Sequence, residues 1–126
     1  MLVKGPSMKV KATREGLVGD KTATGWVIDT TTLFVALPCR KALGKKVEVT
    51  NPLNNKSCIA EVKDVGPWNT NDYAYVFGGE RPAAERGVSI SGHGTNDAGI
   101  DLGEAVWAAL EMKDNGEVEW GFVSDN

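Results

Sequence analysis

Two aspartates, Asp64 and Asp101, stand at the borders of predicted core segments, Asp64 before a predicted turn and Asp101 before a predicted helix. Asp64 ends an alternating stretch, residues 56–64, and stands before the Val-Gly-Pro sequence of residues 65–67. Asp101 precedes apolar residues at helical spacing. If the two carboxylates face each other, like-charge repulsion raises the pKa of one of them. A carboxyl group with a raised pKa can serve as a general acid near neutral pH.

Each aspartate also has a purely structural interpretation. Asp is a preferred helix N-cap, and Glu104 follows Asp101 at the spacing of a capping box, which stabilises a helix by about 1 kcal/mol. The helix dipole lowers the pKa of an aspartate at that position, which opposes a role as general acid. Asp64 can accept backbone N–H bonds in its turn. The remaining loop carboxylates are weaker candidates, because most such groups are simply solvated: Glu15, Asp20 and Asp97.

The elements that position these residues are mostly strands. The length of 126 residues fits one domain, which we place at residues 8–124, with residues 1–7 as a leader, a tag scar or a disordered N-terminus. Alternation and β-branched residues predict strands, of which 46–50 and 56–64 form the clearest hairpin: 8–13, 26–37, 46–50, 56–64 and 117–123. One short helix is predicted at about 102–112. Residues 66–99 form a long loop, of a length that is usually functional.

Composition excludes several classes of function. The net charge of −3 and the scattered basic residues argue against nucleic acid as a partner. The absence of an 18-residue apolar run argues against a transmembrane helix, and a single His without a CxxC pair argues against a zinc site. We therefore expect no metal and no cofactor, and a monomer. The sequence does not decide whether Cys39 and Cys58 form a disulfide or stay as two thiols. No apolar signal region is found near the N-terminus, so we expect a protein made without one, a mature fragment or a cloned domain.

Four short motifs occur in order along the chain: Thr-Ala-Thr-Gly at 22–25, Leu-Gly-Lys-Lys-Val-Glu-Val-Thr-Asn at 43–51, Val-Lys-Asp-Val-Gly-Pro-Trp at 62–68 and Gly-Ile-Asp-Leu-Gly-Glu-Ala-Val-Trp at 99–107. Together they resemble the Thr-Ala-Ser-Gly, Gly-Thr-x-Val-x-Val-Thr-Asn, Asp-Arg-Gly-Pro and Ile-Asp-Leu-Ser segments of rare lipoprotein A-like domains. The resemblance covers residues 10–123. It implies a mainly β fold, a six-stranded double-psi β-barrel, which is shared with expansins and some endoglucanases.

The resemblance also implies activity on a polysaccharide, most directly peptidoglycan, at the cell envelope or outside the cell. Asp101 matches the family's Ile-Asp-Leu aspartate, which resembles the catalytic aspartate of related barrels. Asp101 is therefore the candidate general acid and base of a lytic transglycosylase or glycosidase, and Asp64 its assistant. Aromatic faces suit sugar rings, so the candidate substrate-binding residues are Trp68, Tyr73, Asn69 and Trp26. Trp68 packing over its turn and Trp26 packing over the barrel are the structural alternatives.

Two departures from the family pattern support a different function. Trp26 stands where lytic members carry Glu. The position of their His falls near Pro38, where this sequence has no His. His93 lies far away in the long loop, where an exposed residue is the simplest interpretation, although its near-neutral pKa would suit catalysis. The alternative is a non-catalytic, expansin-like wall- or glycan-binding module. A third interpretation is an assembly or inhibitor module without a glycan ligand, because fold alone does not determine function.

Overall fold

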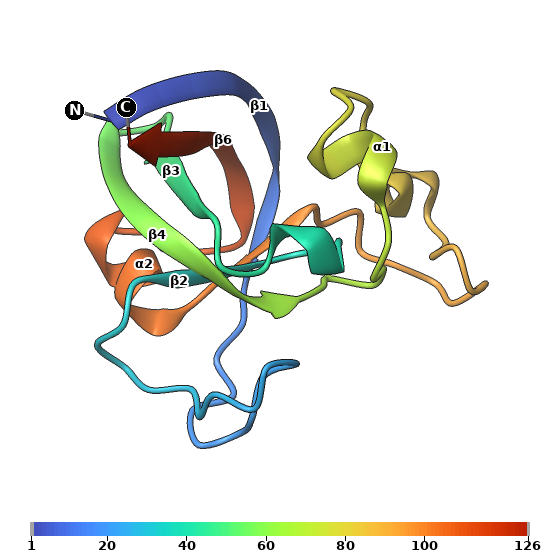
Figure 1. The fold of residues 1–126 in the computed structure, drawn as a ribbon, viewed down its shortest axis with the longest axis horizontal. Helices are drawn as coiled ribbons and strands as arrows, with labels where there is room; N and C mark the ends of the chain where they lie inside the picture. Colours follow the sequence, from blue (N-terminus) through green and yellow to red (C-terminus); the bar gives the residue numbers. More distant parts are fainter. Residues whose placement is uncertain (1, 126) are drawn as a thin grey trace.

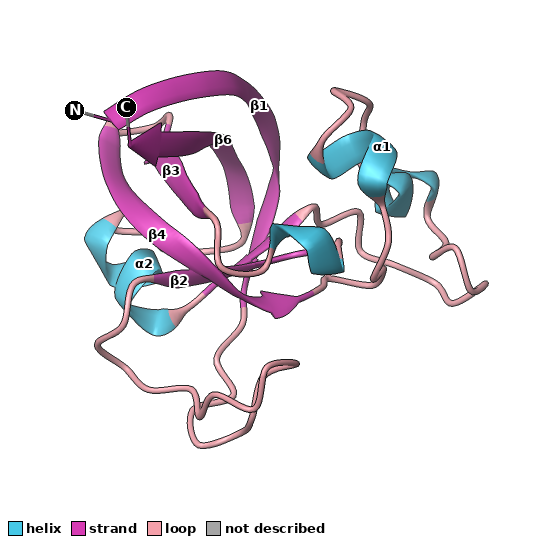
Figure 2. Ribbon diagram, viewed as in Figure 1, coloured by secondary structure: helices cyan, strands magenta, loops and turns pink. Residues whose placement is uncertain are grey.

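The computed structural model describes residues 2–125 and shows a closed six-stranded barrel with short helices at its margins (Figures 1 and 2). The strands are β1 (Leu2–Arg14), β2 (Phe34–Leu37), β3 (Lys46–Asn51), β4 (Lys56–Val65), β5 (Ile100–Leu102) and β6 (Gly116–Asp125). The helices are α1 (Tyr73–Val76), α2 (Glu104–Ala109) and two 3₁₀ turns, Arg40–Ala42 and Ala83–Arg86. Among the described residues, no helix is long and apolar enough to span a bilayer.

The strand order is β1-β5-β2-β4-β3-β6. Each strand keeps equivalent neighbours when the first three strands of the chain are exchanged with the last three. Adding three to each strand number converts the parallel pair β1/β5 into β4/β2, which is also parallel, and the antiparallel pair β1/β6 into β4/β3. Two equivalent halves therefore cross through the loops that follow β1 and β4. This arrangement is the double-psi β-barrel, and it confirms the predicted fold class.

The core lies inside the barrel and follows the two-residue alternation of the strands. Val47 and Val49 of β3 are fully buried, and they face the interior together with Ala60 and Val62 of β4. The inner face of β2 and β5 carries four residues of the same core: Val35, Leu37, Ile100 and Leu102. The hairpin 46–65 matches the sequence prediction, because its alternation placed one face in a core.

The helix near residue 102 differs from the prediction. Residues 100–102 form β5, and α2 begins only at Glu104, with Gly103 at its N-cap. A Cβ atom on Gly103 would lie 2.3 Å from the Phe34 ring, so the chain can pass this ring only with a glycine. Asp101 is thus a strand residue and not the predicted N-cap.

Two further segments differ from their predicted form. Residues 26–33 were expected to be part of a strand, but only residues 34–37 are, and the segment before them is a loop with a single bridge between Lys21 and Val27. Residues 2–7 were placed outside the domain, yet they belong to β1 and pair with the last residues of β6. Neither segment shows a clear alternation with a buried face: residues 2–7 are all exposed, and in residues 26–33 only Ile28 is buried.

The long loop 66–99 contains α1 and the second 3₁₀ turn, and it lies beside β1 (Figure 1). The buried Tyr75 attaches it to the barrel: its hydroxyl donates to the Gly99 carbonyl at 2.9 Å and accepts from Trp120 Nε1 at 2.7 Å. Cys39 and Cys58 are both free thiols, of which Cys39 is buried and Cys58 is half-buried. Burial raises the pKa of the Cys58 thiol to about 11, so it is a packing residue.

Candidate active site

One row of residues runs across four adjacent strands on the outer face of the barrel. The register pairs Thr13 with Asp101, Asp101 with Ala36, and Ala36 with Asp64. Ile100 and Leu102 point into the core, so alternation turns Asp101 to the opposite face. Asp101 and Asp64 lie two strands apart, which is about 9–10 Å between Cα atoms. Ala36 lies between them and is fully buried, so this part of the row is covered.

Asp64 reaches this row through an irregularity in β4. The β2–β4 register shifts between Val35 and Ala36, so that Ala36 pairs with Asp64 and not with Lys63. The sequence predicted that Asp64 continues the inner face of Ala60 and Val62, and the shift is the reason why it lies beside Asp101 instead. The prediction that Asp64 closes a turn is also met, since its Oδ1 accepts the Val65 N–H at 2.8 Å.

Asp101 is largely buried, and its carboxylate has two neighbours on the outer face of the barrel. Thr13, itself buried, donates its hydroxyl hydrogen bond to Asp101 Oδ1. On the other side, a Cβ atom on Gly66 would be 3.9 Å from Asp101 Oδ2, so the turn after β4 lies against the carboxylate. Burial raises the pKa of Asp101 to about 6, the Thr13 hydrogen bond opposes this rise, and the negative charge of Asp64 adds to it.

Glu15 is a third carboxylate at this place. It follows β1 directly, and its backbone N–H donates to the Leu102 carbonyl at 2.9 Å, which fixes it beside β5. Burial, together with the negative charges of Asp64 and Asp101, raises the pKa of Glu15 to about 8. Its Oε2 atom is buried without a hydrogen-bond partner. A protonated Glu15 is therefore the expected form at neutral pH.

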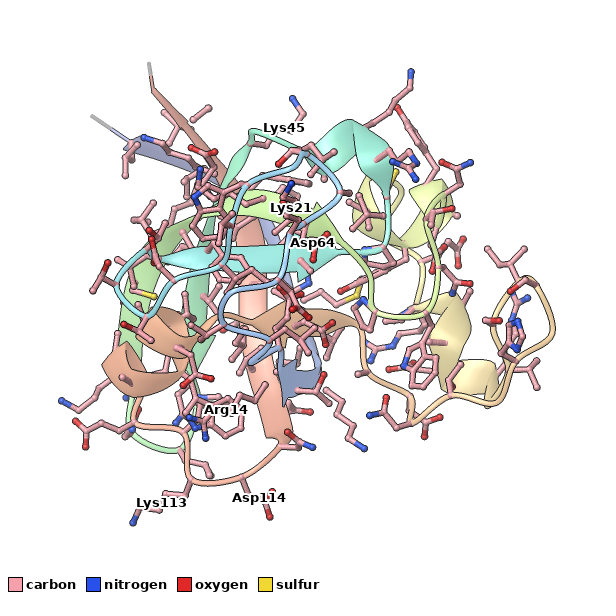
Figure 3. All side chains as sticks on the ribbon, turned by 90° about the horizontal axis from the view of Figure 1, so that it is seen from below. Arg14, Lys21, Lys45, Asp64, Lys113 and Asp114 are labelled. Atoms are coloured by element: carbon pink, nitrogen blue, oxygen red, sulfur yellow. The ribbon has the colours of Figure 1, made fainter. Side chains whose placement is uncertain are left out.

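The loop that follows β1 is attached to the same cluster. The Ala23 N–H donates to Asp64 Oδ1 at 2.9 Å, so the Thr-Ala-Thr-Gly segment of residues 22–25 lies next to the carboxylates. Figure 3 looks onto this loop, with Lys21 and Asp64 close together in the view. Among the side chains of residues 2–124, no ion pair involves Glu15, Asp64 or Asp101. Within the same residues, no three acidic, His or Cys side chains converge as metal ligands.

The predicted substrate-binding residues lie in different environments. Trp68 directly follows the turn that touches Asp101, its indole is 44% exposed, and its Nε1 donates to Asn96 Oδ1 at 2.9 Å. Asn69 is buried, and its Oδ1 accepts the Ile90 N–H at 2.8 Å, which makes it a support of the long loop. Tyr73 is exposed and packs on Phe77, away from this turn.

Trp26 packs edge-on against the Phe34 ring, with centroids 4.9 Å apart, and Lys63 Nζ lies 5.1 Å from the Trp26 ring centre. It therefore covers the barrel, as its structural alternative predicted. His93 is exposed in the turn 89–93, where its N–H and carbonyl bind Ser89. Of the four predicted substrate-binding residues, Trp68 follows the turn that touches Asp101 and Trp26 follows the segment that binds Asp64, so these two adjoin the carboxyl cluster along the chain.

Sequence reasoning ranked Glu15 low and missed Thr13. Both come from the end of β1, and only the pairing of β1 with β5 brings them to Asp101. The available signal was the strand-to-loop transition after Arg14, which is equivalent to the transition after Asp64 in the other half of the barrel. Four surface hollows formed by the described residues have walls that contain none of Glu15, Asp64 and Asp101.

Comparisons with known proteins support the fold and leave the chemistry open. A family model described as "Domain of unknown function (DUF8814)" matches residues 6–86. No curated protein matches the chain. Among solved structures, the chain is similar to "Streptomyces papain inhibitor (SPI)", with a TM-score of 0.57 and 20% identity, over 94% of this chain and 96% of that chain. At this identity, the likeness concerns the fold alone. The resemblance to rare lipoprotein A-like domains stays a prediction.

Proposed function

The chain belongs to the family described as Domain of unknown function (DUF8814), and for this member we propose cleavage of a glycan strand, most directly peptidoglycan, with Asp101 as general acid and base. The observation that carries the proposal is the position of Asp101. It is a largely buried carboxyl group that is hydrogen-bonded by Thr13, faces Asp64 and Glu15, and has no cationic partner among residues 2–124. Since α2 begins after it, the competing role as a helix cap is removed.

The raised pKa gives Asp101 the protonation state that such a reaction needs. Near pH 6 a large fraction of Asp101 carries its proton, which it can donate to the glycosidic oxygen as the C–O bond breaks. The resulting carboxylate then takes the proton of a hydroxyl group of the sugar itself, which attacks the anomeric carbon. The negative charge of Asp64 favours the protonated form of Asp101, and Trp68 offers a ring face beside the turn at Gly66.

The test is release of soluble fragments from purified peptidoglycan sacculi. We expect wild-type protein to release fragments, with a rate that falls as the pH rises above about 6, where Asp101 loses its proton. Asp101→Asn should abolish release, and Asp64→Asn should move the fall to lower pH, because the charge that raises the pKa of Asp101 is gone. Asp20→Asn, which changes an exposed carboxylate in the loop after β1, is the matched control.

Two results would contradict this function. Sacculi that are bound without release of fragments would leave the non-catalytic, expansin-like module. Release by Asp101→Asn at the wild-type rate would remove Asp101 from the chemistry.

A second candidate is inhibition of a protease, and a specific loop favours it. Residues 87–95 form a projecting turn in which Val88 pairs with Gly94, and Ile90 at its tip is 68% exposed. The turn is braced from within, because Ser89 binds both backbone groups of His93, and from below by Asn69. A loop that is ordered before binding loses less entropy in a partner's cleft. The similar structure is named as an inhibitor of papain.

This candidate is tested with papain activity on a small peptide substrate. Inhibition by the wild-type protein that is lost in Ile90→Asp would support it, and full papain activity in the presence of excess protein would exclude it for this protease.

A further inference from the structure

Three hollows beside β1, β3 and β6 share one wall residue, Phe122, which pairs with the inward-facing Val47 and so lies at an end of the barrel interior. Their volumes are about 200, 430 and 480 Å³, and Phe122 contributes to the wall of each. The two larger hollows fall in the size range of small-molecule sites, and they also share Phe77, which follows α1. The aromatic groove, as we name these three hollows, contains none of the three carboxylates of the candidate active site.

Phe77, Phe122 and Trp120 line the aromatic groove, and Tyr73 continues this series of rings outside it. Phe77 stacks on Phe122 with centroids 5.2 Å apart and planes 14° apart, and Tyr73 lies 4.8 Å beyond Phe77. Trp120 meets Phe122 edge-on at 5.2 Å. Tyr73 and Phe77 are 53% and 36% exposed, so part of each side chain stays open to solvent, although Phe77 contacts both Phe122 and Tyr73.

The groove has a backbone cause in β1. The pairing of β1 with β6 is interrupted between Lys4 and Ser7, and a Cβ atom on Gly121 would lie 2.5 Å from the Pro6 carbonyl oxygen. The two strands therefore approach closely at Gly121, where no side chain fills the surface. Pro6 has no N–H group to donate, so this stretch of β1 is a poor template for a further β-strand. An extended peptide added to the sheet is thus the less suitable occupant.

The wall of the groove carries positive charge. Lys45 and Lys46 line the hollow of about 430 Å³, and neither takes part in an ion pair among residues 2–124. Lys4 lines it as well, but it is paired with Glu48 at 2.7 Å. Lys45 is labelled in Figure 3, where its side chain projects from the surface. A ligand that carries carboxylates would complement these two free ammonium groups.

We propose that the aromatic groove is a second binding site, which holds a glycan strand bearing carboxylate groups apart from the carboxyl cluster. The choice of a glycan rests on the proposed function. The C–H faces of sugar rings pack on Phe77 and Phe122, their hydroxyls reach polar side chains of the wall, and the carboxylates meet Lys45 and Lys46. A site of this kind keeps the enzyme on an insoluble strand between cleavage events.

The test measures binding to sacculi in the Asp101→Asn background, so that no ligand is consumed. Adding Phe77→Ala should weaken binding about tenfold, which is the expected effect of one lost stacking ring. Leu53→Ala is the matched control, because Leu53 is apolar, 94% exposed and outside the groove, and it should leave binding unchanged. Lys45→Gln with Lys46→Gln should weaken binding to native sacculi but not to sacculi whose carboxylates are blocked as amides.

Phe77→Leu covers the case that Phe77→Ala is poorly folded by circular dichroism. It keeps apolar volume against Phe122 but lacks a flat face, so we expect weaker binding with an unchanged unfolding curve. Equal binding of the Phe77→Leu and parent proteins would overturn the proposal. So would poly-glutamate that displaces the protein from sacculi and needs Phe77 to do so, because the occupant would then be an acidic peptide. Phe77-dependent binding without any cleavage by wild-type protein would contradict the enzyme function alone and leave this site standing.

Discussion

Replacing Asp101 by Asn should change stability in a way that depends on pH. Burial raises the pKa of Asp101 from 3.8 to about 6, so the folded state holds a proton that the unfolded chain releases. Wild-type stability therefore falls as the pH rises from about 4 to about 6. The difference of roughly 2 pKa units corresponds to about 3 kcal/mol at pH 8, since one unit is about 1.4 kcal/mol.

Asn at position 101 removes this charge but keeps an oxygen that can accept the Thr13 hydrogen bond. Its new amide N–H groups cost about 1 kcal/mol if they find no partner in the site. We therefore expect Asp101→Asn to be about 2 kcal/mol more stable than wild type at pH 8 and about 1 kcal/mol less stable at pH 4. The change between the two pH values is then about 3 kcal/mol.

The assay is urea unfolding at pH 4, 6 and 8, followed by tryptophan fluorescence, with the midpoint and slope fitted separately. Asp20→Asn removes an exposed carboxylate of the adjacent loop and should show a difference from wild type that stays within about 0.5 kcal/mol at each pH. A stability difference between Asp101→Asn and wild type that is the same at pH 4 and pH 8 would refute the reasoning, because Asp101 would then carry no buried charge.

Two further substitutions test the packing that holds the site. Gly103→Ala should destabilise the protein by about 1–3 kcal/mol, because its Cβ would meet the Phe34 ring. Gly94→Ala, where a Cβ meets nothing within 4 Å, should change stability by less than about 0.5 kcal/mol. Equal unfolding midpoints of the two variants in urea would contradict this. Tyr75→Phe should destabilise by about 1–3 kcal/mol, because it leaves the buried Trp120 N–H without an acceptor, and a melting temperature equal to that of wild type would show that the hydrogen bond contributes nothing.

The hairpin and the helix region show what the sequence could and could not predict. Residues 46–50 and 56–64 alternate because one face of each strand meets the core, so their form was readable from residue types alone. The helix was placed too early, because Ile-Asp-Leu at 100–102 continues the helical spacing of the apolar residues that follow. Residues 100–102 form a strand because they pair with β1 and β2 and because Gly103 packs closely against Phe34. No local pattern in the sequence contains these contacts.

The candidate site was predictable in part. Asp64 and Asp101 were both candidates from the sequence, at a strand end and at a predicted cap, but whether they meet was left open until the register placed them in one row. The participation of Thr13 and Glu15 depends on a parallel pairing between residues almost ninety positions apart, which no local pattern contains. The same holds for Asn69, whose amide supports the long loop instead of facing the cluster.

The most direct test of the account is a titration of the Asp101 side-chain carboxyl carbon by NMR, in wild type and in Asp64→Asn. We expect an apparent pKa near 6 in wild type and a lower pKa in Asp64→Asn, because burial and the neighbouring charge both favour the protonated form. A pKa near 4 that is the same in both proteins would contradict it. Asp101 would then be an ordinary solvated carboxylate, and the case for it as the general acid would fall.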